Sequence, residues 1–321
     1  MKILVTGHAG FIGFHVSLKL LQLGHEVVGI DNMNDFYNPM LKHDRENILL
    51  NYPNFDFYYA DICQNPSDES LIGDMFLNNK FDVVVHLAAY ANVRDSVYNS
   101  KPYLESNING FYNILELCKK YNIKKVVYAS SSCVYGNDST TPFTEPIKTS
   151  NPINWYAISK CTNEMMAYSY SSLYNMNIVG LRYFTVYGPW GRPDMAMWLF
   201  TDAIMKNKPI KLFNDGMLVR DFVYIDDVVD ATVKTILHEY TLPFLINIGS
   251  DKSHILQDVV NVIEKSLNKN SKIENKPKND EEMIVTKANM KLANEVLDFH
   301  PKIDIHEGIP KFIEWFKGVN Y

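Results

Sequence analysis

Val5-Thr-Gly-His-Ala-Gly-Phe-Ile-Gly13 is the stretch that decides the fold of this 321-residue chain. It continues a short apolar run, Ile3–Thr6, and opens an amphipathic segment, Phe11–Leu23. Glycines at positions 7, 10 and 13 permit a tight turn from strand to helix, and they let a ligand and the helix approach the backbone closely. The free N–H groups at the start of such a helix favour a bound anion.

Apolar runs and amphipathic stretches alternate through the first half of the chain. This alternation predicts an α/β fold with a doubly wound parallel sheet and right-handed crossovers. The expected strands are Ile3–Thr6, Glu26–Ile30, Phe55–Tyr59, Val83–His86, Val126–Ala129 and Ile178–Tyr183. The expected helices are Phe11–Leu23, Ser67–Asn79, Pro102–Tyr121 and Asn154–Tyr174.

The second expected strand ends in Asp31, 18 residues after Gly13. A carboxylate there accepts hydrogen bonds from a ribose and repels a 2′-phosphate, so the motif favours NAD over NADP. Asp61 and Ile62, and then Leu87, Ala88 and Ala89, follow the next two strands and would lie along the cofactor. The expected contacts also include Gly7, Gly10, Phe11, Ile12 and Gly13. A purely structural glycine turn is the alternative.

Beyond residue 180 the pattern is more mixed. We expect helices at Met195–Asn207, Val228–His238 and Asp258–Leu267, strands at Ile210–Phe213 and Arg220–Tyr224, and a polar surface loop at Asn268–Glu282. Residues 1–180 would form the NAD-binding domain, with later strands returning to its sheet. Residues 181–321 would mainly form a smaller substrate-binding lobe.

Tyr156-Ala-Ile-Ser-Lys160 lies in an expected helix, where residues four apart share a face. An ammonium beside a phenol favours the phenolate, so Lys160 is expected to lower the pKa of Tyr156 and make it a base. Ser130–Gly136 follows the fifth strand and places hydroxyl groups at the sheet crevice, where a substrate would bind. A serine-rich turn is the alternative there.

Composition limits the other classes of function. The net charge is −6, and no dense run of Lys and Arg indicates a nucleic-acid surface. The four cysteines show neither Cys-x-x-Cys spacing nor a neighbouring histidine cluster, so we expect no disulfide framework and no metal site. Without a secretory segment or an apolar run of about 18 residues, a soluble cytoplasmic protein is expected, with no membrane partner.

Together these motifs resemble the extended short-chain dehydrogenase/reductase family, and within it the nucleotide-sugar epimerases and dehydratases. The segments Arg182–Ala196, Gly13-Phe-His15, Ile30-Asp-Asn32 and Arg220–Asp227 resemble the UDP-glucuronate 4-epimerase subgroup. The resemblance covers nearly the whole chain. It implies 4-epimerisation of a nucleotide-linked hexuronic acid through a 4-keto intermediate, with tightly held NAD and a homodimer.

The resemblance also implies a role for each matching residue. Tyr156 would be the acid/base at the sugar 4-hydroxyl, Lys160 would bind the nicotinamide ribose, and Ser131 would bond the same hydroxyl. Further cofactor contacts would be Asn32, Asn107 and Tyr183. The substrate contacts would be Arg94 in the loop after the fourth strand, Ser132, Cys133 and Thr185 at the carboxylate, and Arg192 and Arg220 toward the nucleotide and diphosphate.

Four alternatives stay open. Cys133 stands where the subgroup usually has a hydroxyl residue, which leaves a 4-epimerase for a neutral nucleotide sugar. Lys276–Asp280 replaces the subgroup's usual Pro-Gly-Asp segment near the diphosphate, which leaves a differently linked nucleotide sugar. Dehydratases and decarboxylases of this family carry an acidic residue where this chain has Ser132 or Cys133. A non-catalytic NAD-binding sensor would not need Ser131, Tyr156 and Lys160 together.

Overall fold

The computed structural model describes residues 1–319 except 68, 138–139, 240, 242–243 and 278–280. Its centre is a seven-stranded sheet in the order β10-β6-β5-β4-β1-β2-β3, with every neighbouring pair parallel. The strands are β1 (Lys2–Thr6), β2 (Glu26–Asp31), β3 (Phe55–Tyr59), β4 (Val83–His86), β5 (Lys125–Ser131), β6 (Asn177–Tyr183) and β10 (Leu245–Ile248). The order reverses between β1 and β4, which opens a crevice at the carboxyl ends of the strands. The predicted doubly wound sheet is confirmed.

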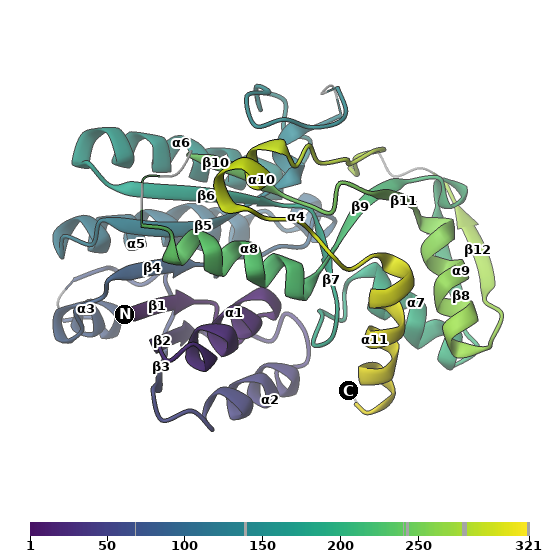
Figure 1. The fold of residues 1–321 in the computed structure, drawn as a ribbon, viewed down its shortest axis with the longest axis horizontal. Helices are drawn as coiled ribbons and strands as arrows, with labels where there is room; N and C mark the ends of the chain where they lie inside the picture. The colour runs from purple at the N-terminus through teal and green to yellow at the C-terminus, as the bar shows by residue number, and fades with distance from the viewer. Residues whose placement is uncertain (68, 138–139, 240, 242–243, 278–280, 320–321) are drawn as a thin grey trace.

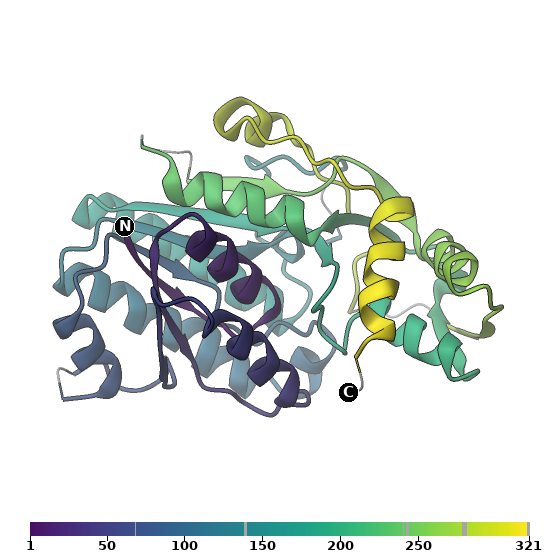
Figure 2. The ribbon, with the colours of Figure 1, turned by 60° about the horizontal axis from the view of Figure 1, so that its bottom comes forward.

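Helices cover both faces of the sheet (Figures 1 and 2). Alternate residues of β1 enter two separate cores, with Ile3 and Val5 on one face and Leu4 on the other. The first face carries α1 (Phe11–Gln22) and α8 (Ile225–Leu237), with α2 (Met40–Leu49) beside α1. The second carries α3 (Leu71–Asn78), α5 (Phe111–Lys120) and α6 (Trp155–Tyr174). Burial on both faces explains why these strands are almost continuously apolar.

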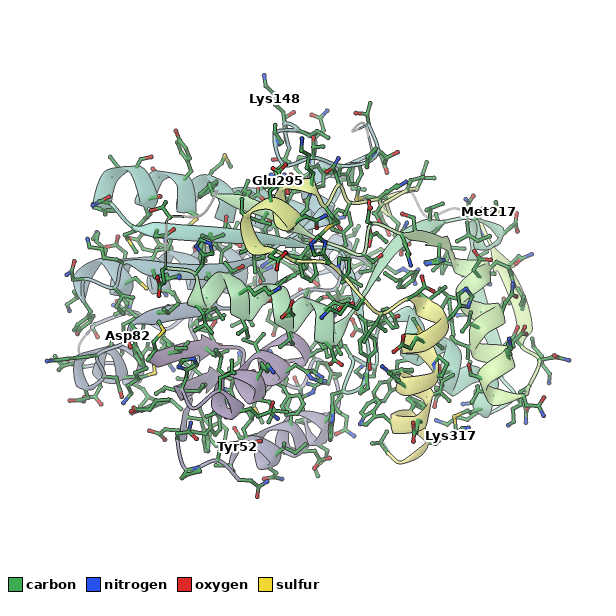
Figure 3. All side chains as sticks on the ribbon, in the orientation of Figure 1. Tyr52, Asp82, Lys148, Met217, Glu295 and Lys317 are labelled. Carbon is green, nitrogen blue, oxygen red and sulfur yellow. The ribbon has the colours of Figure 1, made fainter. Side chains whose placement is uncertain are left out.

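A smaller lobe stands at the carboxyl edge of the sheet, on the right in Figure 1. It contains α7 (Ala196–Met205), β8 (Pro209–Phe213), η3 (Asn214–Gly216), α9 (Leu256–Leu267), β12 (Lys272–Lys276) and α11 (Ile305–Lys317). Met217 and Lys317 mark this lobe in Figure 3, away from Asp82 at the other end of the molecule. A three-stranded sheet of β7 (Thr185–Tyr187), β9 (Val219–Tyr224) and β11 (Ser253–Ile255) joins the lobes. The remaining helices are α4 (Asp95–Tyr98), η2 (Ser132–Tyr135) and α10 (Lys291–Leu297).

Three segments differ from the sequence predictions. The expected helix Pro102–Tyr121 is divided into a π-helix, η1 (Tyr103–Gly110), and α5. The prediction of a loop over Asn268–Glu282 is wrong for β12, because this segment is a strand that pairs in parallel with β8. Its side chains are largely exposed, so the strand has no apolar alternation to reveal it. Helix α2 was not predicted, because Lys42, Arg45 and Glu46 occupy its buried face.

Among the described residues, no helix is long and apolar enough to cross a membrane.

Candidate active site

Two adjoining cavities lie at the carboxyl ends of the parallel strands. The inner cavity, of about 320 Å³, is lined by residues that follow β1 to β6, and the outer one, of about 670 Å³, lies between this edge and the smaller lobe. Thr185, Arg192 and Met195 line both. Of the predicted residues, the inner cavity brings together Gly7, Gly10, Phe11, Ile12, Gly13, Asp31, Asn32, Asp61, Ile62, Leu87, Ala88, Ala89, Ser131, Ser132, Cys133, Tyr156, Lys160, Tyr183, Thr185 and Arg192.

The glycine turn is shaped by close backbone contacts. Gly7 has φ +75°, and a Cβ there would lie 2.8 Å from Ala88 N. A Cβ on Gly13 would collide with the carbonyl oxygen of Gly7. Gly10 caps α1 without a side-chain hydrogen bond, and the first turn of the helix holds no acidic residue. The turn therefore presents free N–H groups and a positive helix end, which suits a diphosphate.

Asp31 ends β2 at the far side of this turn. Its Oδ1 accepts a hydrogen bond from Met33 N at 2.8 Å and lies 3.4 Å from the Nζ of Lys42. Asn32 donates to Asp61 Oδ2 at 3.0 Å, which ties the ends of β2 and β3 together. Lys42 also lines the inner cavity and was missed by the sequence analysis, because α2 itself was missed.

Two predicted cofactor residues are held by hydrogen bonds of their own. Asn107 is buried in η1, where it accepts from Tyr90 N at 2.8 Å and donates to Tyr90 O and Ser159 Oγ, both at 2.9 Å. It is not among the residues that line the two cavities in the described part of the chain, and it supports the loop after β4 from behind. The hydroxyl of Tyr183 lies 2.8 Å from Thr232 Oγ1 while its ring lines the inner cavity.

The catalytic candidates meet where β5 ends and α6 begins. Asn154 caps α6 by accepting from Ala157 N at 2.8 Å, which fixes Tyr156 in the first turn. Lys160 follows one turn later, with its Nζ 5.9 Å from the centre of the Tyr156 ring and donating to Ala129 O at 2.8 Å. Ser131, at the end of β5, lies with Tyr156 in the lining of the inner cavity.

Lys160 is expected to lower the pKa of Tyr156, but the groups of the protein raise it. Burial, with a smaller contribution from Cys133, raises the pKa of Tyr156 to about 12, while the Ser131 hydroxyl and the Arg192 charge lower it. Burial also lowers the pKa of Lys160 to about 8. Desolvation of both groups outweighs the attraction between them that the four-residue spacing predicts. Arg192, not Lys160, is the cation that lowers the pKa of Tyr156.

The residues that are expected to bind the carboxylate of the sugar line the same cavity as Tyr156. Ser132 and Cys133 lie in η2, which Ser131 caps by accepting from Cys133 N at 3.2 Å. Thr185 starts β7 and lines the same cavity. Burial raises the pKa of the Cys133 thiol, so this side chain is a neutral, weak donor near pH 7.

Three arginines surround the outer cavity. Arg192 reaches both cavities and is held by Asp194, with Nε–Oδ1 and Nη2–Oδ2 distances of 2.9 and 2.5 Å. Arg94 and Arg220 line only the outer cavity and share Glu282, whose Oε1 accepts from Arg94 Nε and whose Oε2 lies 3.5 Å from Arg220 Nη2. Sequence reasoning missed Glu282, since no local pattern joins it to Arg94, 188 residues earlier.

Comparison with known proteins agrees with this geometry. The profile of the NAD dependent epimerase/dehydratase family matches residues 3–249. A UDP-glucuronate 4-epimerase of Thermodesulfobacterium geofontis is 40% identical over 318 residues, which cover 98% of this chain and 95% of that protein. The Bacillus cereus UDP-glucuronic acid 4-epimerase in complex with UDP-glucuronic acid and NAD superposes with a TM-score of 0.93 at 32% identity, covering 99% of both chains.

A neutral-sugar enzyme is also structurally similar. The UDP-glucose 4-epimerase of Thermotoga maritima with UDP-glucose has a TM-score of 0.89 at 29% identity, again over 99% of both chains. Fold similarity therefore does not separate the two sugars. With a matching family profile over most of its length and full-length relatives at about 40% identity, this chain belongs to the NAD dependent epimerase/dehydratase family.

Proposed function

We propose that this chain is an NAD-dependent 4-epimerase that interconverts UDP-glucuronate and UDP-galacturonate. The observation that carries the proposal is the convergence of Ser131, Tyr156 and Lys160 on one cavity beside the glycine turn. This cavity opens into a second one surrounded by arginines, which suits a substrate with a diphosphate and a carboxylate. The full-length similarity to UDP-glucuronate 4-epimerases supports the choice of sugar.

Residues 1–180, with β10 completing the sheet, would hold NAD, and residues 181–321 would mainly hold the sugar nucleotide. The turn at Gly7–Gly13 would receive the diphosphate of the cofactor, and Asp31 the adenosine ribose. The crowded glycine positions fit this role, because any Cβ at Gly7 or Gly13 would distort the turn. When bound, NAD would supply the hydride acceptor and donor at C4 of the sugar. The adenosine of the cofactor would also contact Asn32, Asp61 and Ile62. The rest of the cofactor would pass along the sheet beside the Leu87–Ala89 segment.

Tyr156 would remove the proton from the sugar 4-hydroxyl, and later return it to the opposite epimer. Ser131 would orient the same hydroxyl by a hydrogen bond of its own, since it lines the cavity together with Tyr156. Because burial alone raises the pKa of Tyr156, the base form needs nearby positive charge. Arg192 supplies part of it, and Lys160 would place its ammonium on the nicotinamide ribose, with Tyr183 packed beside it.

The carboxylate of a 4-keto-hexuronate is β to the ketone, so the intermediate loses CO2 easily. Hydrogen bonds that hold the C–CO2 bond near the plane of the carbonyl would oppose that loss. We assign this task to Ser132, Cys133 and Thr185, which all line the inner cavity. In a Thr185→Val variant we expect bicarbonate to appear beside the epimer. Unchanged turnover without bicarbonate would remove Thr185 from this role.

A neutral hexose is the second candidate, and Cys133 favours it because a thiol binds a carboxylate more weakly than a hydroxyl does. Proton NMR of the purified protein with UDP-glucuronate, and separately with UDP-glucose, without added NAD tests both. The expected result is that the H4 couplings of the sugar change to those of UDP-galacturonate and that no bicarbonate appears. Conversion of UDP-glucose alone would select the neutral sugar, and turnover of neither would contradict the epimerase proposal.

We also propose a homodimer that forms through α6 together with the segment of η1 and α5, as expected for Pro102–Tyr121 and Asn154–Tyr174. Met165, Tyr168 and Leu173 on this helix are 65, 64 and 71% exposed, and such an apolar surface on a cytoplasmic protein suits a second copy. The four free cysteines suit a reducing compartment. Light scattering should report a dimer that Leu173→Glu dissociates. Met217→Glu, at an exposed apolar residue of the smaller lobe, should leave the dimer intact.

A further inference from the structure

Helix α2 carries a fully buried arginine that the mechanism above does not use. The guanidinium of Arg45 donates from Nη1 to Ala9 O and to the hydroxyl of Tyr37, both at 2.8 Å. Its Nη2 donates to Trp190 O at 2.5 Å and lies 3.4 Å from Gly191 O. Arg45 therefore joins the glycine turn to the loop around Trp190, which lies 145 residues after Arg45 in the chain.

Among the residues that the structure describes, no carboxylate forms an ion pair with Arg45. Within the described residues its hydrogen-bond partners are all carbonyl or hydroxyl oxygens, and its guanidinium carbon lies 5.8 Å from the centre of the Tyr37 ring. Its Nε is buried without a hydrogen-bond partner. The neighbouring Glu46 is engaged by His8 at 3.0 Å and by Tyr59 at 2.5 Å. A buried, unpaired cation is costly, so a structural tie alone would be better made by a neutral side chain. Its position behind Ala9 adds positive potential where the glycine turn would receive a diphosphate.

The loop on the other side of Arg45 is tightly held and leads directly into the catalytic cavity. Trp190 has φ +62°, which is strained for a residue with a large side chain. His15, in α1, donates from Nε2 to Pro189 O at 3.0 Å. Arg192 follows two residues after Trp190 and lowers the pKa of Tyr156. Arg45 and His15 therefore hold this loop against the glycine turn and its helix.

We infer that Arg45 is a positioning residue that couples the cofactor diphosphate to the placement of Arg192 against Tyr156. It does so by holding the glycine turn with Nη1 and the Trp190–Gly191 carbonyl groups with Nη2. The inference rests on the proposed function, because it needs a dinucleotide at the glycine turn. Lysine cannot replace arginine here, since an ammonium has no planar fork to reach both segments.

The test compares Arg45→Lys with Lys42→Met, each alone and combined with Arg192→Lys. Lys42 is a matched control because it is also buried on α2 and lines the cofactor cavity, but contacts Asp31 and Asn34 instead of the Trp190 loop. Both single variants should retain less NAD after gel filtration. Arg45→Lys should lower kcat about tenfold, and its effect should not multiply with that of Arg192→Lys, whereas the Lys42 and Arg192 effects should multiply. Multiplicative effects for Arg45 as well would overturn the coupling.

Hydrogen–deuterium exchange gives a readout that does not depend on activity. In Arg45→Lys, exchange should rise about tenfold in both the 7–13 and the 188–192 peptides, and bound NAD should protect both peptides in wild type. In Lys42→Met the 188–192 peptide should exchange as in wild type. If NAD protects only the 7–13 peptide, the two segments are not coupled and the inference fails. If wild type shows this protection but no epimerisation of UDP-glucuronate, the proposed function fails and the coupling stands.

Discussion

The two cavities at the sheet edge are built in different ways. The inner cavity is made from short motifs, such as the glycine turn and the Tyr156–Lys160 helix turn, whose members are close in sequence. The outer cavity depends on Arg94, Arg220 and Glu282, which come from three distant segments. The catalytic residues therefore come from motifs that are short in sequence. Binding of an anionic substrate depends instead on how the two lobes meet.

Tyr156→Phe gives the largest expected effect and is confined to the inner cavity. Removing the phenol oxygen should lower the epimerisation rate by about 10³-fold, since proton transfer by a positioned side chain contributes 10²- to 10⁴-fold. NAD should still copurify, because the glycine turn and Asp31 are untouched. The rate is followed by NMR and the nucleotide by its absorbance after denaturation. A rate within tenfold of wild type would mean that Tyr156 is not the acid/base.

Arg220→Met addresses the outer cavity. The KM for UDP-glucuronate should rise roughly 10- to 100-fold with a much smaller change in kcat, because a hydrogen bond to a charged group contributes about 1.5–3 kcal/mol. Arg94→Met should have a smaller effect, since its side chain is 44% exposed compared with 15% for Arg220. Initial rates over a range of substrate concentration separate KM from kcat. A loss of kcat without a change in KM would move Arg220 into the chemistry of the inner cavity.

Much of the inner cavity could be predicted from sequence, because glycine spacing and helical periodicity are local. The protein's own groups raise the pKa of Tyr156 where the sequence predicts that Lys160 lowers it, because a four-residue spacing gives no measure of burial. Asn107 lies behind the cavity wall, which no local pattern records. Helix α2, with Lys42 and Arg45, was missed because its buried face is charged. The carbonyl groups that Arg45 binds belong to the glycine turn and the Trp190 loop, which are distant from α2 in the sequence.

His15→Gln tests the junction between the two regions. Burial, opposed by the Pro189 hydrogen bond, lowers the pKa of His15 to about 4. Between pH 6.5 and 4 the unfolded chain therefore binds a proton that the folded chain does not, so wild type loses stability as pH falls through this window. The variant lacks this loss. Between pH 7.5 and 5 the free energy of unfolding of wild type should fall by about 2 kcal/mol more than that of His15→Gln. The free energies of unfolding are measured by urea titration at each pH. If they fall equally with pH in wild type and variant, His15 is protonated in the folded protein.

Glu282→Gln gives the smallest expected effect. Glu282 occupies Arg94 and Arg220 and so competes with an anionic substrate for both. Neutralising it should lower the KM for UDP-glucuronate a few-fold, and the gain should shrink as added salt screens the arginines. Steady-state rates at low and high ionic strength measure this. A higher KM would show that Glu282 orients the arginines for the substrate.

The central claim is that one site oxidises and re-reduces the same carbon of the sugar with NAD that stays bound. UDP-glucuronate carrying deuterium at C4 tests it most directly, with the protein in ordinary water and no added NAD. The account predicts UDP-galacturonate that keeps its deuterium at C4. Product with hydrogen at C4, or a requirement for added NAD in each turnover, would contradict it.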